Sequence, residues 1–341
     1  MITLVDEELS MIADAAERLF ADLAAADRKR RQLESQRIGY AVVRDALDQL
    51  GLFGDVADTA PMTRAAVQVR IALEAGAASL PFPVLETLAA HAVIRKPGIW
   101  IASSASVERD VAVLPELRAD GLHGMAALVP FARLADTLLV VARRANATVL
   151  TQVRQNVRGM TLRDRTSVEP DYPVQDVVFD GSPAELLPDT AAQALNRRSV
   201  LLASAEIAGA CRQMVAMARE HLLTRTQFGQ PLGANQALKH ALADAHVRVE
   251  ALTTSLLYAA AADDAQADDA TAAILAAKVF AGRAGRLVAD SMFQLHGAIG
   301  YTMEYPLHLL IRRVHRLGVS HGSTTAQADR LFNLFEATCP N

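Results

Sequence analysis

The sequence predicts an α+β protein with an N-terminal helical domain, a small middle β domain and a C-terminal four-helix bundle. Three successive sequence patterns along the 341 residues support this fold class. Apolar residues follow a helical repeat over residues 1–96, short apolar runs lie between turn residues over 97–187, and long helical repeats cover 188–341. We therefore expect three structural units with these boundaries.

The first zone is expected to contain four helices. Residues 7–36 are rich in Ala, Leu, Glu and Arg, and their apolar positions fall on one helix face. A second helix is expected over 40–52, where it stops near two glycines. Two further helices, 62–77 and 84–94, are expected on either side of a break that contains two prolines.

The middle zone holds short apolar runs that are separated by clusters of Gly, Pro, Asp and Arg. This pattern is typical of a small, mostly antiparallel β domain. The expected strands are 99–101, 111–114, 137–141, 148–153 and 177–179.

The last zone predicts long antiparallel helices with short turns, which is the pattern of a four-helix bundle. A first helix runs through Val200 and Leu222, and its apolar residues step by three and four. The acidic turn 263–269 is interpreted as a solvated connection. The other expected helices are 236–262, 271–299, 304–316 and 324–335.

The composition argues against several classes of protein. Basic residues number 34 and acidic residues 38, so the net charge of −4 gives no reason to expect nucleic acid or an anionic membrane as partner. No uninterrupted apolar run reaches about 18 residues, and the N-terminus lacks the basic-then-apolar order of a signal peptide. Cys211 and Cys339 are too few for a disulfide framework, and Cys211 is expected to be a buried thiol. A cytoplasmic protein is the default expectation.

General motifs add little to this reading. No Gly-x-Gly-x-x-Gly, Walker, paired-cysteine metal or Gly-x-Ser-x-Gly motif stands in a suitable place, so no metal site is expected. Composition and periodicity alone lead no further than an α+β protein that is expected to form oligomers.

Three stretches of the C-terminal zone lead further because of their order and spacing. They are Arg225–Leu232 followed by Gln236, then 294–306, then 312–323. Together they resemble the C-terminal domain of acyl-CoA dehydrogenases. The helical–β–helical order extends this resemblance, more loosely, to the whole chain, and it implies an acyl-CoA dehydrogenase-like fold.

The resemblance implies that FAD is the cofactor. Guanidinium groups suit phosphate oxygens because their planar, forked donors match the geometry of the anion. For Arg225 the alternative role is to cap the end of a helix, and His296 and His308 are expected to be structural histidines. The residues that the resemblance assigns to cofactor binding, mostly in the site of a neighbouring subunit, are Arg225, Phe228, Gln236, Gln294, Gly297 and Ser323.

The sequence departs from the family where the catalytic base should stand. The family's reaction removes the α-proton of an acyl-CoA thioester, almost always with a glutamate, while the β-hydrogen leaves as hydride to the flavin. The usual glutamate position holds His321 here, and the alternative position in the first bundle helix holds Ser199. The family's Thr-Glu-Pro-x-Ala-Gly-Ser-Asp run, which binds the flavin ring and the acyl-CoA, is also missing between residues 103 and 114.

These departures resemble the shorter, glutamate-lacking subunit of bacterial heteromeric (α2β2) acyl-CoA dehydrogenases of steroid side-chain degradation. The resulting hypothesis is a non-catalytic subunit that completes the FAD site of a catalytic partner subunit, with an acyl-CoA substrate such as a steroid side-chain CoA ester. Two alternatives stay open. One is a self-sufficient homo-oligomeric enzyme that uses His321 as base, because an imidazole can accept a proton near neutral pH. The other is a scaffold that binds no flavin.

Overall fold

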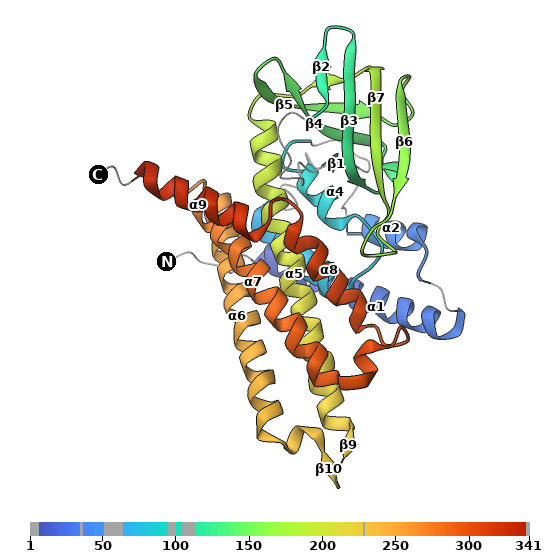
Figure 1. Ribbon diagram of the computed structural model, residues 1–341, viewed down its shortest axis with the longest axis vertical. Coiled ribbons are helices and arrows are strands. Elements are labelled where there is room, and N and C mark those ends of the chain that lie inside the picture. Colours follow the sequence, from blue (N-terminus) through green and yellow to red (C-terminus); the bar gives the residue numbers. More distant parts are fainter. Residues whose placement is uncertain are drawn as a thin grey trace.

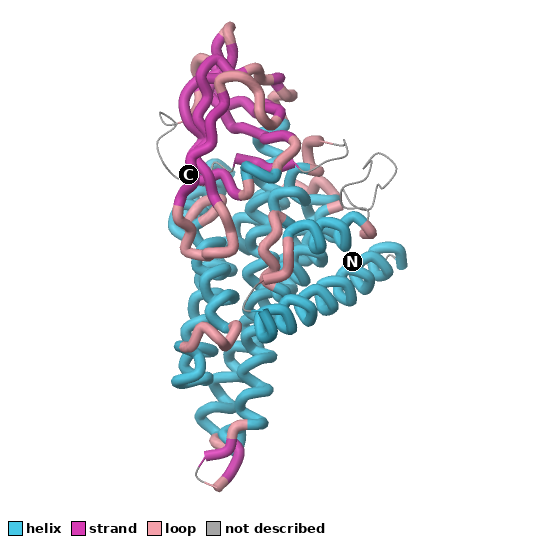
Figure 2. Tube along the Cα trace, turned by 90° about the vertical axis from the view of Figure 1, so that its right-hand side faces the viewer, coloured by secondary structure: helices cyan, strands magenta, loops and turns pink. Residues whose placement is uncertain are grey.

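The computed structural model describes residues 7–34, 37–50, 64–94, 100–103, 114–227 and 229–338. Helices, then strands, then helices follow one another along the chain, as the sequence predicts. The β sheet lies at one end of the long axis, and the β9–β10 hairpin lies at the opposite end (Figure 1). The helices of both helical zones fill the space between these ends (Figure 2).

The N-terminal zone contains four helices, and their bounds differ from expectation mainly at the ends. The third helix ends where Ser79 adopts a left-handed conformation with φ of 50°, which stops the helical repeat before the Pro81–Pro83 segment. Residues 35–36, 51–52 and 62–63 of the expected helices lie outside the described residues. The four helices are α1 (Glu7–Glu34), α2 (Tyr40–Asp48), α3 (Ala65–Ala78) and α4 (Val84–Ala90).

The middle zone forms a mostly antiparallel sheet, with eight strands in the described part of the chain. The order is β6-β7-β3-β2-β4-β5-β8, and β1 and β2 both pair with β4 in parallel. β2, β3, β6 and β8 were not expected; β6 is mostly exposed and polar, so it carries little apolar signal. The expected strand 111–114 lies mostly outside the described residues. The bounds are β1 (Trp100–Ser103), β2 (Glu116–Arg118), β3 (Gly121–Pro130), β4 (Thr137–Arg144), β5 (Ala147–Arg154), β6 (Met160–Arg165), β7 (Val174–Ser182) and β8 (Glu185–Leu186).

The C-terminal zone is built around one central helix. α5 is long and apolar enough to cross a membrane by length and composition, yet 78% of that apolar window is buried inside the protein. It therefore serves as the core helix against which the other helices pack. The elements are α5 (Ala191–Thr224), β9 (Thr226–Gln227), β10 (Gln230–Pro231), α6 (Gln236–Asp264), α7 (Ala270–His296), a 3-10 turn (Gly297–Tyr301), α8 (Leu307–Val319) and α9 (Thr324–Thr338).

Two glycines bring α3 and α5 into backbone contact. A Cβ atom at Gly76 would lie 2.1 Å from the carbonyl oxygen of Glu206, and one at Gly209 would lie 1.8 Å from that of Leu73. Such distances leave no room for a side chain at either position. Close packing of this kind locks the N-terminal helices onto the bundle.

A buried network of charges joins all three zones. Arg313 of α8 is 2% exposed and donates hydrogen bonds to Glu169 (2.7 and 3.0 Å) and to the carbonyl of Leu80 (2.8 Å). Arg316 donates to the second oxygen of Glu169 (2.8 Å) and lies 3.5 Å from the ring centroid of Tyr172. Tyr172 in turn donates to Glu86 of α4.

The pKa values in this network follow from the balance of burial and pairing. Burial by itself raises the pKa of Glu169, but Arg313 and Arg316 outweigh it and bring that pKa down to about 2. Glu169 is therefore ionised at neutral pH and neutralises buried positive charge. By contrast, burial raises the pKa of Glu86 despite the same arginines.

Only part of the acidic stretch 263–269 is the solvated connection that the sequence predicts: residues 265–269 are exposed, but Asp263 and Asp264 are the last residues of α6 and are paired. Asp263 is buried and pairs with Arg197 and Arg198 at 3.0 Å each. Asp264 accepts hydrogen bonds from the backbone N–H groups of Ala65 and Ala66 at 2.6 and 3.0 Å. Two carboxylates of the turn thus tie α6 to α5 and stabilise the N-terminus of α3.

Cys211 is a buried thiol, as expected. It lies in α5 beside Gly285 of α7, and burial raises its pKa to about 12. A thiol with such a pKa stays protonated and unreactive at neutral pH. Cys339 lies outside the described residues.

Removing the Arg313 side chain should destabilise the protein strongly. Arg313→Ala leaves a buried carboxylate with one partner fewer and removes donors from two backbone carbonyls. We expect the free energy of unfolding to fall by about 3–5 kcal/mol in urea titrations. Arg312→Ala is the matched control. Among the described residues, the Arg312 side chain makes only one long hydrogen bond, 3.5 Å to the carbonyl of Val168, so its removal should cost less than about 1 kcal/mol. Equal losses in both variants would contradict the proposed role of the network.

Candidate functional site

Arg225 stands at the far end of the bundle, where α5 stops. Its backbone N–H donates to the carbonyl of His221 (2.9 Å), and its carbonyl accepts from Leu232 (2.9 Å), so the β9–β10 hairpin folds back onto the helix end. Gly229 takes the left-handed conformation, with φ of 81°, that the hairpin turn requires. Phe228 lies outside the described residues.

The Arg225 side chain does not cap the helix. Its guanidinium is exposed and makes no hydrogen bond or ion pair with any described residue. Only the backbone N–H of Arg225 serves the helix end. The alternative expectation of a helix-capping side chain therefore finds no support, and the guanidinium is free for an external anion.

Gln236, Gln294 and Gly297 lie at the same end of the bundle. Gln236 is the exposed first residue of α6, whose start Asn235 caps by accepting from Ala237 N–H (2.9 Å). Gln294 is exposed in the last turn of α7, which ends at Gly297 with φ of 60° and ψ of −139°. That backbone conformation is accessible to glycine and strained for other residues.

Two stacked histidines hold the ends of α5 and α7 together. The rings of His221 and His296 lie 5.2 Å apart. His296 also contacts the carbonyl of Met292 through Nδ1 (2.7 Å) and the hydroxyl of Tyr305 through Nε2 (3.1 Å), so it is the structural histidine that the sequence predicts. We call the end of the bundle that carries Arg225, Gln236, Gln294 and Gly297 the bundle tip.

His308 fits its expected structural role only in part. Its Nε2 contacts the carbonyl of Met303 at 3.2 Å. Its Nδ1 is buried and has no hydrogen-bond partner among the described residues.

His321, Ser323 and Ser199 lie away from the bundle tip. Gly282 of α7 contacts Thr324, which follows Ser323 directly, and twelve residues of helix separate Gly282 from Gln294. At 1.5 Å per residue, this separation is about 18 Å. The sequence-predicted residues therefore fall into two groups at different levels of the bundle.

His321 is 7% exposed and adopts a left-handed conformation with φ of 56°. Burial, together with the positive charges of Lys278 and Arg316, lowers its pKa to about 3. The imidazole is thus neutral at neutral pH, but it binds a proton far more weakly than a base matched to that pH.

Neither of the other two residues supplies a carboxylate. Ser199 is buried on α5. Ser323 is half-buried, and its hydroxyl accepts from Ala326 N–H (3.3 Å). It lines a cavity of about 460 Å³ between α7, α8 and α9, together with Gly282, His315 and Thr325.

Sequence reasoning missed Glu206, a buried carboxylate on the same face of α5 as Ser199. Seven residues, or two helical turns, separate them. Burial raises the pKa of Glu206 to about 7, although Arg313 lies 3.9 Å away. The available signal was that Glu206 is the only charged residue between 199 and 211.

Comparison with known proteins gives the class to which this arrangement belongs. Residues 189–332 match the C-terminal domain of acyl-CoA dehydrogenases. Acyl-CoA dehydrogenase IpdE2 of Mycobacterium tuberculosis is 28% identical over 291 residues, which are 83% of this chain and 79% of the relative.

Two solved structures show the same fold along the whole chain. The Tcur3481–Tcur3483 steroid ACAD variant superposes with a TM-score of 0.85 at 24% identity, over 97% of this chain and 98% of its own. The ChsE4–ChsE5 complex from Mycobacterium tuberculosis gives a TM-score of 0.83 at 20% identity, over 99% of both chains.

The helical–β–helical fold and the matched C-terminal domain are those of acyl-CoA dehydrogenases. Residues 189–332 thus form an acyl-CoA dehydrogenase C-terminal domain, and the chain as a whole is similar to acyl-CoA dehydrogenases.

The raised pKa of Glu206 predicts a specific dependence of stability on pH. Below about pH 4.5, Glu206 is protonated in both states, so its contribution to stability is fully present. As the pH rises from about 4.5 to about 7, the unfolded state ionises first and this stability is lost, by about 3 kcal/mol in total. Glu206→Gln should abolish this loss, so the variant gains about 3 kcal/mol over the native chain between pH 4 and pH 8 in urea titrations.

Glu220→Gln provides the control, because Glu220 is exposed on the same helix. Its pH profile of stability should follow that of the native chain within about 0.5 kcal/mol. A Glu206→Gln profile that also follows the native chain would show that Glu206 is ionised in the folded protein across this range.

Proposed function

We propose that this chain is the non-catalytic subunit of a heteromeric acyl-CoA dehydrogenase and that its bundle tip completes the FAD site of a catalytic partner subunit. The observation that carries the proposal is the free guanidinium of Arg225 at the bundle tip, combined with the absence of a carboxylate at His321 and Ser199. The chain thus has an exposed guanidinium that suits a cofactor held by another subunit, and it lacks the carboxylate that would act as the catalytic base.

The bundle tip fits one part of FAD. A pyrophosphate needs cationic, forked donors, and the exposed guanidinium of Arg225 offers them. The exposed amides of Gln236 and Gln294 add neutral donors and acceptors on either side. All of these groups face outward, so they suit a cofactor that is held mainly by another subunit.

The chain's own residues are poorly suited to catalysis. FAD, when bound, supplies the acceptor for the β-hydride of the thioester, and the protein must supply a base for the α-proton. His321 is buried beside two cationic side chains, and its pKa of about 3 makes it a weak proton acceptor. A self-sufficient enzyme with His321 as base is therefore the less favoured alternative.

The comparisons favour a two-chain assembly and a steroid substrate. The structures with the same fold include a complex of ChsE4 with ChsE5 and a steroid ACAD. We extend both features to this chain: an α2β2 assembly that acts on a steroid side-chain CoA ester in the cytoplasm. Exposed apolar side chains on α6, α7 and α9 suit burial against other subunits; they include Val247, Tyr258, Leu287, Phe332 and Phe335.

One experiment separates this proposal from its alternatives. The chain is purified alone and with a co-expressed catalytic subunit, and flavin is measured by its visible absorbance. Flavin that appears only with the partner supports the proposal. Flavin in the chain alone would favour the homo-oligomeric enzyme, and no flavin in either preparation would favour the flavin-free scaffold.

Arg225→Ala should lower the FAD content of the assembled complex. Losing one charge-assisted contact to phosphate costs about 1.5–3 kcal/mol, which corresponds to a roughly tenfold to hundredfold weaker affinity. The fold should survive, because the side chain is exposed. Arg219→Ala is the matched control, since Arg219 is also exposed on α5 and lies about one and a half turns earlier. Unchanged FAD affinity in a correctly assembled Arg225→Ala complex would refute the role of the tip.

His321→Ala should reduce the turnover of the assembled complex by less than about tenfold. Removing a true general base typically costs about 10²–10⁴-fold. Turnover and thermal stability are measured on the same preparation, so that a loss of fold is not mistaken for a loss of chemistry. A drop of a hundredfold or more in a stable complex would assign the base to His321.

A further inference from the structure

Two histidine rings lie face to face at the bundle tip, next to Arg225. His221 belongs to the last turn of α5 and His296 to the last turn of α7. Their ring centroids are 5.2 Å apart and their planes are inclined by 25°, so the rings are stacked. Arg225 follows His221 by four residues, which is about one helical turn. The partly exposed imidazole of His221 and the exposed guanidinium of Arg225 are therefore neighbours at the tip.

His296 has a fixed role in this pair, because both of its ring nitrogens are engaged. Nδ1 lies 2.7 Å from the carbonyl oxygen of Met292, which can only accept, so Nδ1 carries the proton of the neutral ring. Nε2 lies 3.1 Å from the hydroxyl of Tyr305, which can donate to it. Burial lowers the pKa of His296. His296 is thus neutral near pH 7, and His221 is the ring of the pair that is left to take up a proton.

The surroundings of His221 disfavour that proton while no anion is bound. Burial lowers the pKa of His221, and the neighbouring His296 and Arg225 lower it further. The end of α5 acts in the opposite direction, because the carbonyl end of a helix favours a cation. The hairpin residues 226–235, which fold back onto this helix end, include no charged side chain. An anion at Arg225 would offset an unfavourable charge, so the imidazole would bind a proton more strongly.

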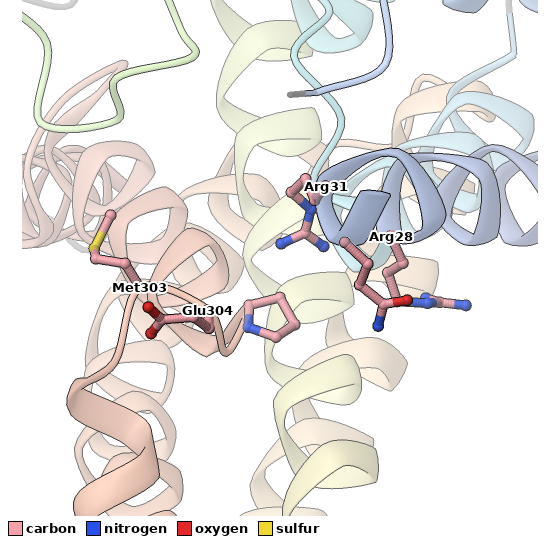
Figure 3. Close-up of a pocket in the computed structure, with 6 residues that line it drawn as sticks. Arg28, Arg31, Met303 and Glu304 are labelled. Carbon is pink, nitrogen blue, oxygen red and sulfur yellow. The ribbon is translucent and has the colours of Figure 1, made fainter. Parts of the chain in front are cut away.

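Two acids of the same region do not take the place of this anion. Burial and, after it, the exposed Glu220 raise the pKa of Tyr305. Glu304 lines a separate cavity that faces the end of α1 (Figure 3). Neither carboxylate is among the groups that shift the pKa of His221. Since the guanidinium of Arg225 pairs with no described residue, both side chains are open to an external anion.

We infer that His221 is a second anion ligand of the bundle tip and that it takes up a proton when an anion binds at Arg225. A charged imidazole donates from both nitrogens, and hydrogen bonds between charged groups are the strong ones. Arg225 then contacts the anion at every pH, whereas His221 adds a strong contact only when its ring is charged. The inference rests on the proposed function, because the anion in question is the pyrophosphate of FAD.

The direction of the pH effect follows from the coupling between proton and anion, which is reciprocal. Well below the pKa of His221 in the free chain, the ring is charged with or without the anion, and anion affinity is highest. As the pH rises through the pKa of the free chain toward that of the bound state, only the bound state keeps its proton and affinity falls. Above both pKa values the ring is neutral in both states, and its contribution is lost.

Nuclear magnetic resonance on the full-length chain, with isotope-labelled histidine rings, tests the inference without FAD and without a partner. The pKa of His221 is measured in sodium sulfate and in sodium chloride at equal ionic strength, since sulfate keeps its charge throughout the titration. Sulfate should raise this pKa by about half a pH unit or more. In Arg225→Ala the pKa in chloride should rise, because a neighbouring cation is gone, and the effect of sulfate should fall by about half or more.

The assembled complex provides a second measurement, the affinity for FAD at pH 6 and at pH 8. The native complex should bind FAD about threefold or more tightly at pH 6 than at pH 8. His221→Phe keeps a stacked ring that cannot be protonated, so most of this difference should disappear while affinity at pH 8 stays within about twofold. His246→Phe is the matched control and should keep the native difference. His246 is exposed on α6, ten residues or about 15 Å beyond Gln236.

The outcomes separate the inference from the proposed function. The inference is overturned if sulfate leaves the pKa of His221 unchanged, or if His221→Phe keeps the native difference between pH 6 and pH 8. A complex whose FAD affinity is unaffected by Arg225→Ala would contradict the proposed function instead. The sulfate titration would still decide whether His221 is an anion ligand, because that measurement needs no flavin.

Discussion

The ion pair between Arg313 and Glu169 is the interaction on which the assembly of the three zones depends. Arg313 belongs to α8 and Glu169 to the segment between β6 and β7. The carbonyls that Arg313 also contacts belong to the end of α3 and to the segment that follows it. A buried guanidinium has a high desolvation cost, which only a full set of acceptors offsets. The network is therefore satisfied only when bundle, sheet and N-terminal helices are all in place.

The same network explains why the pocket around His321 is unfavourable for a base. Arg316 and Lys278 place positive charge beside a buried imidazole, and both charge and burial disfavour the protonated ring. A catalytic glutamate at this position would instead be held ionised by such neighbours. The environment that would suit a carboxylate is thus present without the carboxylate. Glu206, two turns beyond Ser199 on α5, is the buried acid that lies nearest in sequence to either expected base position.

The two ends of the bundle have different physical character. At the bundle tip, the groups that could hold a cofactor are exposed and point outward. At the other level, charged groups are buried and mutually satisfied, as in the contacts of Arg313 and Glu169. Exposed, unpaired donors are suited to binding something that another molecule also holds, whereas a closed network is suited to stability.

The sequence by itself determined the order of helical and β zones and the helical character of α1 to α9, because local periodicity carries that information. It missed β6, whose side chains are mostly exposed and polar, and it misread Asp263 and Asp264, because an acidic run gives no sign that distant arginines and a helix start will cover it. Only the tertiary structure decided that Arg225 is free, that His321 is buried among cations and that Glu206 is an acid with a raised pKa. These are properties of burial and long-range pairing, which arise when segments more than a hundred residues apart come into contact.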